Sequence, residues 1–246
     1  DSANSSYGTA IVGTASGNSI TFGTPVAFNS GTTNYTSTTY DPVANKVVIA
    51  YTDNDNSEYG NAIVGTVSGD SITFGTPEVF NSGGTRYDGI TYDSTAKKVV
   101  IAYQDNGNSD YGTAVVGTVS GSSITFGTPV VFNSRGVDWL APVYDPVANK
   151  VVISYRDKDN SNYGTVVSGA VSDNSISFDT PVVFMAGNTI YISTTYDPTA
   201  KKVVIAYQDN GNSGSGTAIT YGAGGEPNVF AGTAISSTEL NIKDTV

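Results

Sequence analysis

Four aromatic residues recur at one position of a repeated segment, and their chemistry suits the binding of a ligand. They are Tyr35, Tyr87, Trp139 and Tyr191, and each lies 52 residues after the one before it. The segment around them differs between copies more than any other part of the repeat. Binding residues concentrate on variable segments that a rigid scaffold positions, and flat aromatic rings stack on the C–H faces of sugars. We therefore expect this position to contact a ligand.

Charged residues accompany two of the four aromatic residues. Arg86 and Asp88 flank Tyr87, whereas Arg135 and Asp138 precede Trp139. Planar guanidinium and carboxylate groups form the paired hydrogen bonds that neighbouring sugar hydroxyls can take. The alternative is that the aromatic residues are packing wedges between adjacent units. The predicted ligand-binding set is Tyr35, Arg86, Tyr87, Asp88, Arg135, Asp138, Trp139 and Tyr191.

The residue types present argue against catalysis. The chain has no His and no Cys, so ordinary zinc sites and imidazole-dependent triads are unavailable. Sialidase-like chemistry would need an arginine cluster, but Arg156 follows a different predicted strand from Arg86 and Arg135. Asp88 and Asp138 are the only carboxylate pair that we consider for glycoside hydrolysis, and a lyase would need Tyr or Lys as its base. We predict no catalytic residue and no enzyme activity.

Composition limits the partners and the location. The net charge of -11 argues against nucleic acid or an anionic membrane, because both attract basic surfaces. No apolar run approaches the roughly 18 residues of a membrane span, so we expect no membrane insertion. An acidic, Thr/Asn/Gly-rich chain is common outside cells, and we expect an extracellular or virion-surface location. The sequence begins at Asp1 in the middle of a repeat, so we expect a processed product or a piece of a longer protein.

The elements that must position these residues belong to a 52-residue repeat. The run Lys46-Val-Val-Ile-Ala-Tyr51 recurs from Lys98, Lys150 and Lys202. Each unit is predicted to hold four strands, and the continuous apolar character of this run indicates a strand buried on both faces. No segment has a helical period. The repeats cover about 1–52, 53–104, 105–156 and 157–208, and a divergent closing segment covers 209–246.

A sheet of four short strands cannot bury both of its faces alone, but radial stacking of such sheets can bury them. We therefore predict an all-β fold, a β-propeller of four-stranded blades that forms a single domain over residues 1–246. A linear solenoid is the rival. The ring would close by pairing N- and C-terminal strands. Five blades are favoured, with 228–235 and 239–243 completing the N-terminal hairpin; in the four-blade alternative, 191–207 completes it.

One repeated loop resembles a known motif. The segment Tyr103-Gln-Asp105-Asn-Gly107-Asn-Ser109 is similar to the Asp-box hairpin of sialidase-type propellers, and its relatives begin at Asp1, Asp53, Asp157 and Asp209. Tyr replaces the first hydroxyl residue of that motif, and Ser replaces its Thr. We expect the Asp and Ser side chains to bind backbone amides and close the turn. Calcium is the alternative at Asp53, Asp55 and Asn56, and no other cofactor or metal is expected.

The whole repeat resembles the propeller repeats of tail fibres and other surface proteins of marine phages and bacteria. The resemblance covers residues 1–222 and depends on Lys-Val-Val-Ile-Ala-Tyr-x-Asp, Asn-Ser-x-Tyr-Gly-Thr-Ala and Ser-Ile-Thr-Phe-Gly-Thr-Pro. It implies contact with a host surface or the positioning of other domains.

Together these observations predict a non-catalytic, lectin-like propeller that binds a cell-surface glycan for adhesion or host recognition. It would belong to a phage tail fibre or a secreted adhesin, within a larger fibre or oligomer. A structural or protein-docking propeller in a fibre is the alternative, followed by a glycan-active hydrolase or lyase.

Overall fold

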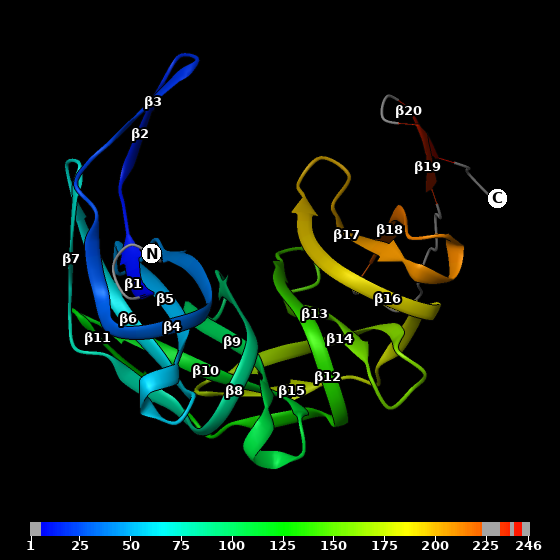
Figure 1. Cartoon of the computed structure of the whole chain (residues 1–246), viewed down its shortest axis with the longest axis horizontal. Coiled ribbons are helices and arrows are strands. Elements are labelled where there is room, and N and C mark those ends of the chain that lie inside the picture. Colours follow the sequence, from blue (N-terminus) through cyan, green and yellow to red (C-terminus); the bar gives the residue numbers. More distant parts are fainter. Residues whose placement is uncertain (1–5, 223–231, 237–238, 243–246) are drawn as a thin grey trace.

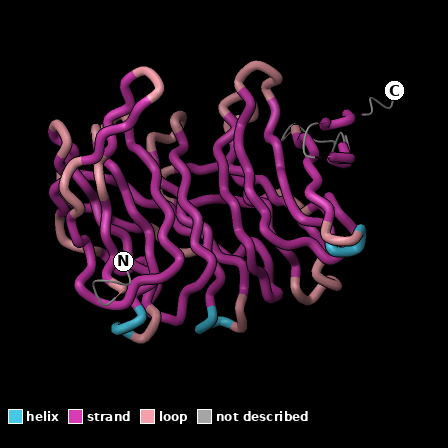
Figure 2. Tube along the Cα trace, turned by 45° about the horizontal axis from the view of Figure 1, so that its top comes forward, coloured by secondary structure: helices cyan, strands magenta, loops and turns pink. Residues whose placement is uncertain are grey.

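The computed structural model describes residues 6–222, 232–236 and 239–242, and these residues form antiparallel β-sheet almost throughout. The described helical segments are single 3₁₀ turns, and none has the length and apolar character to cross a membrane. The turns lie along one edge of the molecule (Figure 2), at η2 (Asn54–Asn56), η3 (Asn106–Asn108) and η4 (Asn210–Asn212). The predicted all-β class and the internal repeat are confirmed.

Each complete unit is built on the Lys-Val-Val-Ile-Ala-Tyr strand, which is buried on both faces as its sequence predicts. These second strands are β5 (Lys46–Asp53), β9 (Lys98–Asp105), β13 (Lys150–Asp157) and β17 (Lys202–Asp209). The third strands pair with them and are β6 (Tyr59–Ser68), β10 (Tyr111–Ser120), β14 (Tyr163–Ser172) and β18 (Ser215–Tyr221). Val47 pairs with Gly65 and Val99 pairs with Gly117, so the sequence repeat is also a repeat of register.

Sixteen-residue strands join one unit to the next. They are β4 (Val26–Asp41), β8 (Glu78–Asp93), β12 (Val130–Asp145) and β16 (Val182–Asp197). In β8, Glu78 pairs with Ala62 of the preceding sheet, whereas Gly89 pairs with Ala102 of the following sheet. The ladder shifts register between Arg86 and Gly89. The variable segment is therefore a bulge within one bent strand and not a free loop.

Short hairpins complete the outer edge of each unit. Their last strands are β3 (Ser19–Phe22), β7 (Ser71–Phe74), β11 (Ser123–Phe126) and β15 (Ser175–Phe178). In the first unit, β1 (Tyr7–Ala10) pairs with β4, and β2 (Gly13–Ser16) pairs only with β3 among the described strands. The β2–β3 hairpin consequently projects from the body of the molecule (Figure 1).

Aromatic side chains hold successive sheets together. Phe80 packs on Tyr103 and Phe126 of the next unit, with ring centroids 5.1 and 5.9 Å apart, and the same contacts recur in neighbouring units. The ring of Phe132 lies over Gly112, where an added Cβ would be 2.5 Å from the ring. Apolar clusters fill the spaces between consecutive sheets. Each sheet is thus stabilised mainly by the sheets beside it.

The units form an open arc, and the predicted propeller is wrong. Apart from the separate β2–β3 hairpin, strand pairing connects β1 through successive sheets to β20, but no pairing joins the first sheet to the last among the described strands. β17, which begins in the 191–207 segment of the four-blade alternative, pairs with β16 and β18 instead. β19 (Gly232–Ser236) and β20 (Glu239–Ile242) extend the fifth sheet and do not complete the first, so the five-blade closure fails as well.

The physical reason is that the repeat encodes how one sheet packs on the next, whereas closure requires complementary strands at the two ends. In the first unit, β1 pairs with β4. At the other end of the chain, β19 pairs with the edge of β18 and not with a strand of the first unit. Residues 228–231 and Lys243, which the five-blade prediction also used, lie outside the described residues, as does Asp1.

Gly112→Ala should lower the free energy of unfolding by about 1–3 kcal/mol, because the new methyl group overlaps the Phe132 ring. Urea denaturation measures this change. Gly216→Ala in β18 is the matched control, since a Cβ there has no described atom within 4 Å. Equal stability of the two variants would show that the Gly112 contact does not constrain packing.

Candidate functional site

The four aromatic residues predicted to bind a ligand form one continuous row. Ring centroids are 5.1 Å apart for Tyr35 and Tyr87, 5.6 Å for Tyr87 and Trp139, and 4.7 Å for Trp139 and Tyr191. The rings are tilted or edge-on to each other, as aromatic pairs prefer. The row crosses adjacent long strands β4, β8, β12 and β16, so consecutive units each contribute one ring.

The backbone at each bulge explains how these rings meet. Tyr35, Tyr87, Trp139 and Tyr191 have φ values of 48°, 51°, 53° and 53°, in the left-handed region. This conformation costs a non-glycine residue on the order of 1–2 kcal/mol, and surrounding contacts must offset it. A bulge redirects a side chain relative to a regular strand. Here it aims each ring at the ring of the neighbouring unit.

The row combines packing with accessibility. Tyr35 and Tyr191 are exposed at its ends, whereas Tyr87 and Trp139 are partly buried. Trp139 also packs against the apolar cluster between the fourth and fifth sheets. The interpretation as a ligand contact and the interpretation as a packing wedge each describe part of the environment of these rings. The same rings hold adjacent units together and present aromatic surface to solvent.

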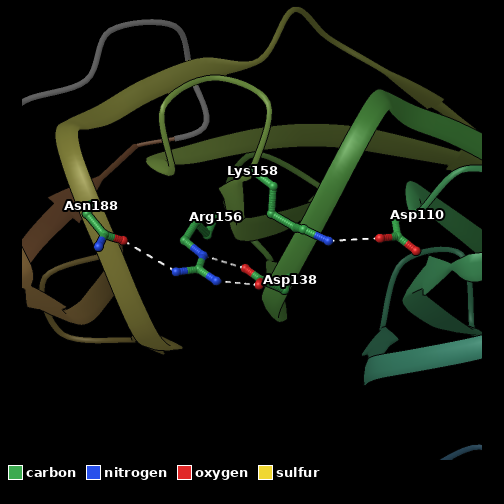
Figure 3. A network of polar contacts seen from close by, with 5 residues as sticks. All are labelled: Asp110, Asp138, Arg156, Lys158 and Asn188. Atoms are coloured by element: carbon green, nitrogen blue, oxygen red, sulfur yellow. Dashed lines mark hydrogen bonds and ion pairs between the residues drawn. The ribbon is translucent and has the colours of Figure 1, made fainter.

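A bidentate ion pair lies at the fourth sheet (Figure 3). Arg156 donates from Nε and Nη2 to the two carboxylate oxygens of Asp138, over 2.7 and 2.5 Å. Its Nη1 donates to Oδ1 of Asn188 over 3.3 Å. Asp138 is buried, and its carboxylate raises the pKa of the Arg156 guanidinium. Arg156 therefore reaches a predicted site residue, although the sequence places it on a different strand.

Further ion pairs connect neighbouring units on the same side. Lys158 donates to Oδ2 of Asp110 over 2.8 Å, and Arg86 lies 3.3 Å from Oε1 of Glu58 (Figure 3 shows the first pair). Burial chiefly raises the pKa of Tyr87, and the charges of Asp138, Arg156 and Lys158 also act on it. Arg86 directly precedes Tyr87 and Asp138 directly precedes Trp139, so the charged network and the aromatic row share the same bulges.

Asp88 has a different environment from the other predicted site residues. It is buried, and neither carboxylate oxygen accepts a hydrogen bond from another described residue. The equivalent positions of the next two units hold Leu140 and Ile192, which belong to apolar clusters. Burial raises the pKa of the Asp88 carboxyl well above its ordinary value. Asp88 is thus a carboxyl group in a place that favours an apolar side chain.

Arg135, the remaining predicted residue, is an exposed residue of β12. Its charge lowers the pKa values of Tyr155 and Asp157, although burial outweighs it and both values stay above the ordinary ones. Arg135 therefore acts on the repeated Asp loop at the end of β13 as well as facing solvent.

The Asp-containing loops connect strands. In the second unit, Asp55 accepts a hydrogen bond from the backbone N–H of Thr32 over 3.0 Å, and Asp53 accepts one from the side chain of Asn29 over 3.4 Å. Asp209 accepts from the backbone N–H of Gly211 over 2.9 Å within its own turn. Each of these loops is thereby linked to itself or to the adjoining long strand. No group of three or more acidic side chains is placed to hold a metal ion in the described part of the chain.

The sequence prediction missed Arg156, Asn188, Lys158 and Asp110. The sequence does contain a signal for Arg156. Register places Asp138 opposite Arg156, and in the fifth unit it places Ile190 opposite Gln208. Among the four equivalent pairs, Arg stands at the second position only in the unit that has Asp at the first. Paired departures of this kind within a repeat indicate side chains that contact each other across strands.

Asp88→Leu should raise the free energy of unfolding at pH 7 by about 2 kcal/mol, because it removes an unpartnered buried carboxyl group. The raised pKa means that folded Asp88 keeps its proton to higher pH than unfolded Asp88 does, so the wild type loses stability as pH rises through that interval. The gain should therefore shrink below about pH 4. Urea denaturation across pH tests this, with the exposed Glu78→Leu of the same strand as control. A stability gain from Asp88→Leu that does not change with pH would contradict the conclusion that Asp88 is a buried carboxyl group with a raised pKa.

Arg156→Gln should destabilise the protein by about 2–3 kcal/mol, because it leaves Asp138 buried without its ionic partner. The double variant Asp138→Ile/Arg156→Gln reproduces the pair found in the fifth unit and should recover most of that loss. Chemical denaturation of the wild type, Arg156→Gln, Asp138→Ile and the double variant gives the coupling energy. If the double variant were less stable than Arg156→Gln, the loss in Arg156→Gln would not come from leaving Asp138 without a partner.

The sequence was also compared with known proteins. No protein-family model matches the chain, and no curated protein matches it. The resemblance to Asp-box hairpins and to phage-fibre repeats therefore has no support from a relative, and a proposal about function depends on the residues described above.

Proposed function

We propose that this chain is a non-catalytic glycan-binding module that acts outside the cell or on a virion surface. One observation carries the proposal: four aromatic rings form a continuous row with a charged network beside it. An extended carbohydrate presents alternating C–H faces and hydroxyl groups. A row of rings with adjacent hydrogen-bonding groups matches both features.

The central part of the row provides the polar contacts. A sugar ring that stacks near Tyr87 and Trp139 would lie beside Asp138 and Arg156. Arg156 uses three nitrogen atoms in its contacts with Asp138 and Asn188, and a guanidinium carries five N–H donors. The remaining donors can bind hydroxyl oxygens without breaking the ion pair.

The charge pairing favours an uncharged glycan. Arg86, Arg156 and Lys158 each pair with a carboxylate, so their charges are already compensated. An anionic sugar would have to displace those carboxylates, whereas neutral hydroxyl groups would not. The net charge of -11 acts in the same direction, because it repels anions at long range.

The environments of the two carboxylates support a non-catalytic role. Glycoside hydrolysis uses one carboxyl group as an acid and another as a base or nucleophile, with both facing the substrate. Asp88 is buried, and Asp138 is held in its bidentate ion pair. Neither has the solvent-facing position that this chemistry requires.

Affinity for one sugar should be modest, since stacking on partly covered rings gives limited contact area. Useful avidity would come from several units or several copies that engage a polymer together. This fits a role in a larger fibre or oligomer, where adhesion or host recognition depends on many weak contacts.

A glycan-array screen of the chain tests the proposal, with Trp139→Ala and Tyr40→Ala measured beside the wild type. Tyr40 is an exposed aromatic residue outside the row, so it is the matched control. We expect binding to neutral glycans that Trp139→Ala weakens at least about tenfold, which corresponds to 1.4 kcal/mol, and that Tyr40→Ala leaves unchanged. A folded wild type that binds no glycan, or equal losses in both variants, would refute it.

A further inference from the structure

The chain contains two copies of one 15-residue segment in different tertiary surroundings. Residues 95–109 and 199–213 are identical, and each holds an Asn that is followed by Gly, at Asn106 and Asn210. Because Gly has no Cβ, its backbone nitrogen can approach the side chain of the preceding Asn closely. The two pairs lie in equivalent 3₁₀ turns, η3 and η4. A difference in reactivity between the two Asn residues in the folded protein must therefore come from their tertiary contacts.

In the third unit, the side chain of Asn106 is held by three neighbours. In the amide orientation that satisfies these neighbours, its nitrogen donates to Oδ1 of Asp110 over 3.0 Å and to Oε1 of Gln104 over 3.2 Å. Its oxygen accepts from Nε of Arg86 over 3.1 Å. Asn106 is also partly buried. A reaction at this amide would first have to break these contacts.

In the fifth unit, two of the three neighbours are replaced. Ile190 stands at the place of Arg86. Gly214 stands at the place of Asp110. Asn210 is exposed, and its side chain forms no hydrogen bond with the described part of the chain. Its amide is consequently able to turn toward the next backbone nitrogen.

A third replacement changes the contact of the backbone N–H that would react. In the third unit, Asn81 donates to Oδ1 of Asp105 over 3.3 Å, and Asp105 accepts no capping hydrogen bond in its turn. Met185 takes the place of Asn81 in the fifth unit and cannot donate. There, Oδ1 of Asp209 accepts from the backbone N–H of Gly211 over 2.9 Å. The carboxylate of Asp209 thus contacts the proton that must leave when the Gly211 nitrogen attacks.

We propose that Asn210 is a site of spontaneous deamidation in the folded protein and that Asn106 is protected. The backbone nitrogen of Gly211 attacks Cγ of Asn210, the Cγ–Nδ2 bond breaks, and ammonia leaves. Asp209 takes the proton from the attacking nitrogen as a general base and passes it to the leaving nitrogen. Water then opens the cyclic imide at either carbonyl carbon, which gives aspartate or isoaspartate. The net reaction consumes water, releases ammonia and turns an amide into a carboxylate.

The products of this reaction disfavour the turn in which they form. The new carboxylate directly follows the buried Asp209, and like charges at such a short distance repel each other. Isoaspartate also adds a methylene group to the backbone of η4. Glycan binding plays no part in this chemistry, so it does not depend on the function proposed above.

Incubation of the folded chain at mildly alkaline pH, followed by trypsin digestion and fragment-ion mass spectrometry, tests the proposal. Trypsin releases residues 99–135 and 203–243 as separate peptides, each with one Asn-Gly pair. We expect Asn210 to deamidate at least about tenfold faster than Asn106, because the hydrogen bonds of Asn106 must break first. In urea the two rates should be equal, because the local sequences are identical. Equal rates in the folded chain, or unequal rates in urea, would overturn the proposal.

The double variant Ile190→Arg/Gly214→Asp gives the fifth unit the two neighbours that it lacks, and it should slow the deamidation of Asn210. Asp is compatible with this place, since Asp110 and Gly214 have the same left-handed backbone, with φ values of 62° and 72°. The rate at Asn106 in the same sample is the control and should not change. A double variant that deamidates at Asn210 as fast as the wild type would also overturn the proposal.

Met185→Asn tests the contribution of Asp209 separately. The new amide supplies the donor that the third unit has, so it should draw the Asp209 carboxylate away from the reacting N–H. Deamidation of Asn210 should become slower without any change in its own side-chain contacts. An unchanged rate in Met185→Asn would overturn the role of Asp209 as the general base.

Discussion

Every part of this structure depends on one constraint: each sheet is apolar on both faces and must be covered on both. Strands such as β9 and β13 place Val and Ile alternately toward the preceding and the following unit, so no sheet can be stable alone. The contacts that satisfy the constraint are the same at each step, with Phe80 on Tyr103 and then Phe132 on Tyr155. Stability is therefore shared between neighbours, as in other repeat architectures.

The long strands turn this stacking into a surface that can bind. Because one strand serves two sheets, it must bend where it leaves the first and enters the second, and the bulge at Tyr87 or Trp139 is that bend. The left-handed backbone there is unfavourable for an aromatic residue, and ring-to-ring packing along the row offsets the cost. Strain, packing between units and the candidate binding surface are thus properties of the same few residues.

Differences between the units are concentrated where the scaffold tolerates them. The ion pair of Asp138 with Arg156 and the buried carboxyl of Asp88 belong to adjacent units near the middle of the arc. The place of Asp88 holds Thr, Leu or Ile in the other units, and the place of Asp138 holds Asn, Arg or Ile. The repeated core cannot vary in this way, since Gly112 and Phe132 fix each other in close contact. The residues that differ between units therefore provide the specific chemistry, and the residues that recur in every unit provide the stability.

The sequence alone determined the all-β class, the 52-residue unit, the strand buried on both faces and the spacing of the four aromatic residues, because these depend on local alternation and period. It did not determine whether the arc closes, since closure depends on the strands available at the two ends and on where β19 and β20 pair. It did not reveal that Arg156 reaches Asp138 or that Asp88 is buried, because both depend on register across strands and on how each bulge directs its side chains. Local pattern specifies how one unit meets the next, and only the tertiary structure decides how the series ends and which side chains share a surface.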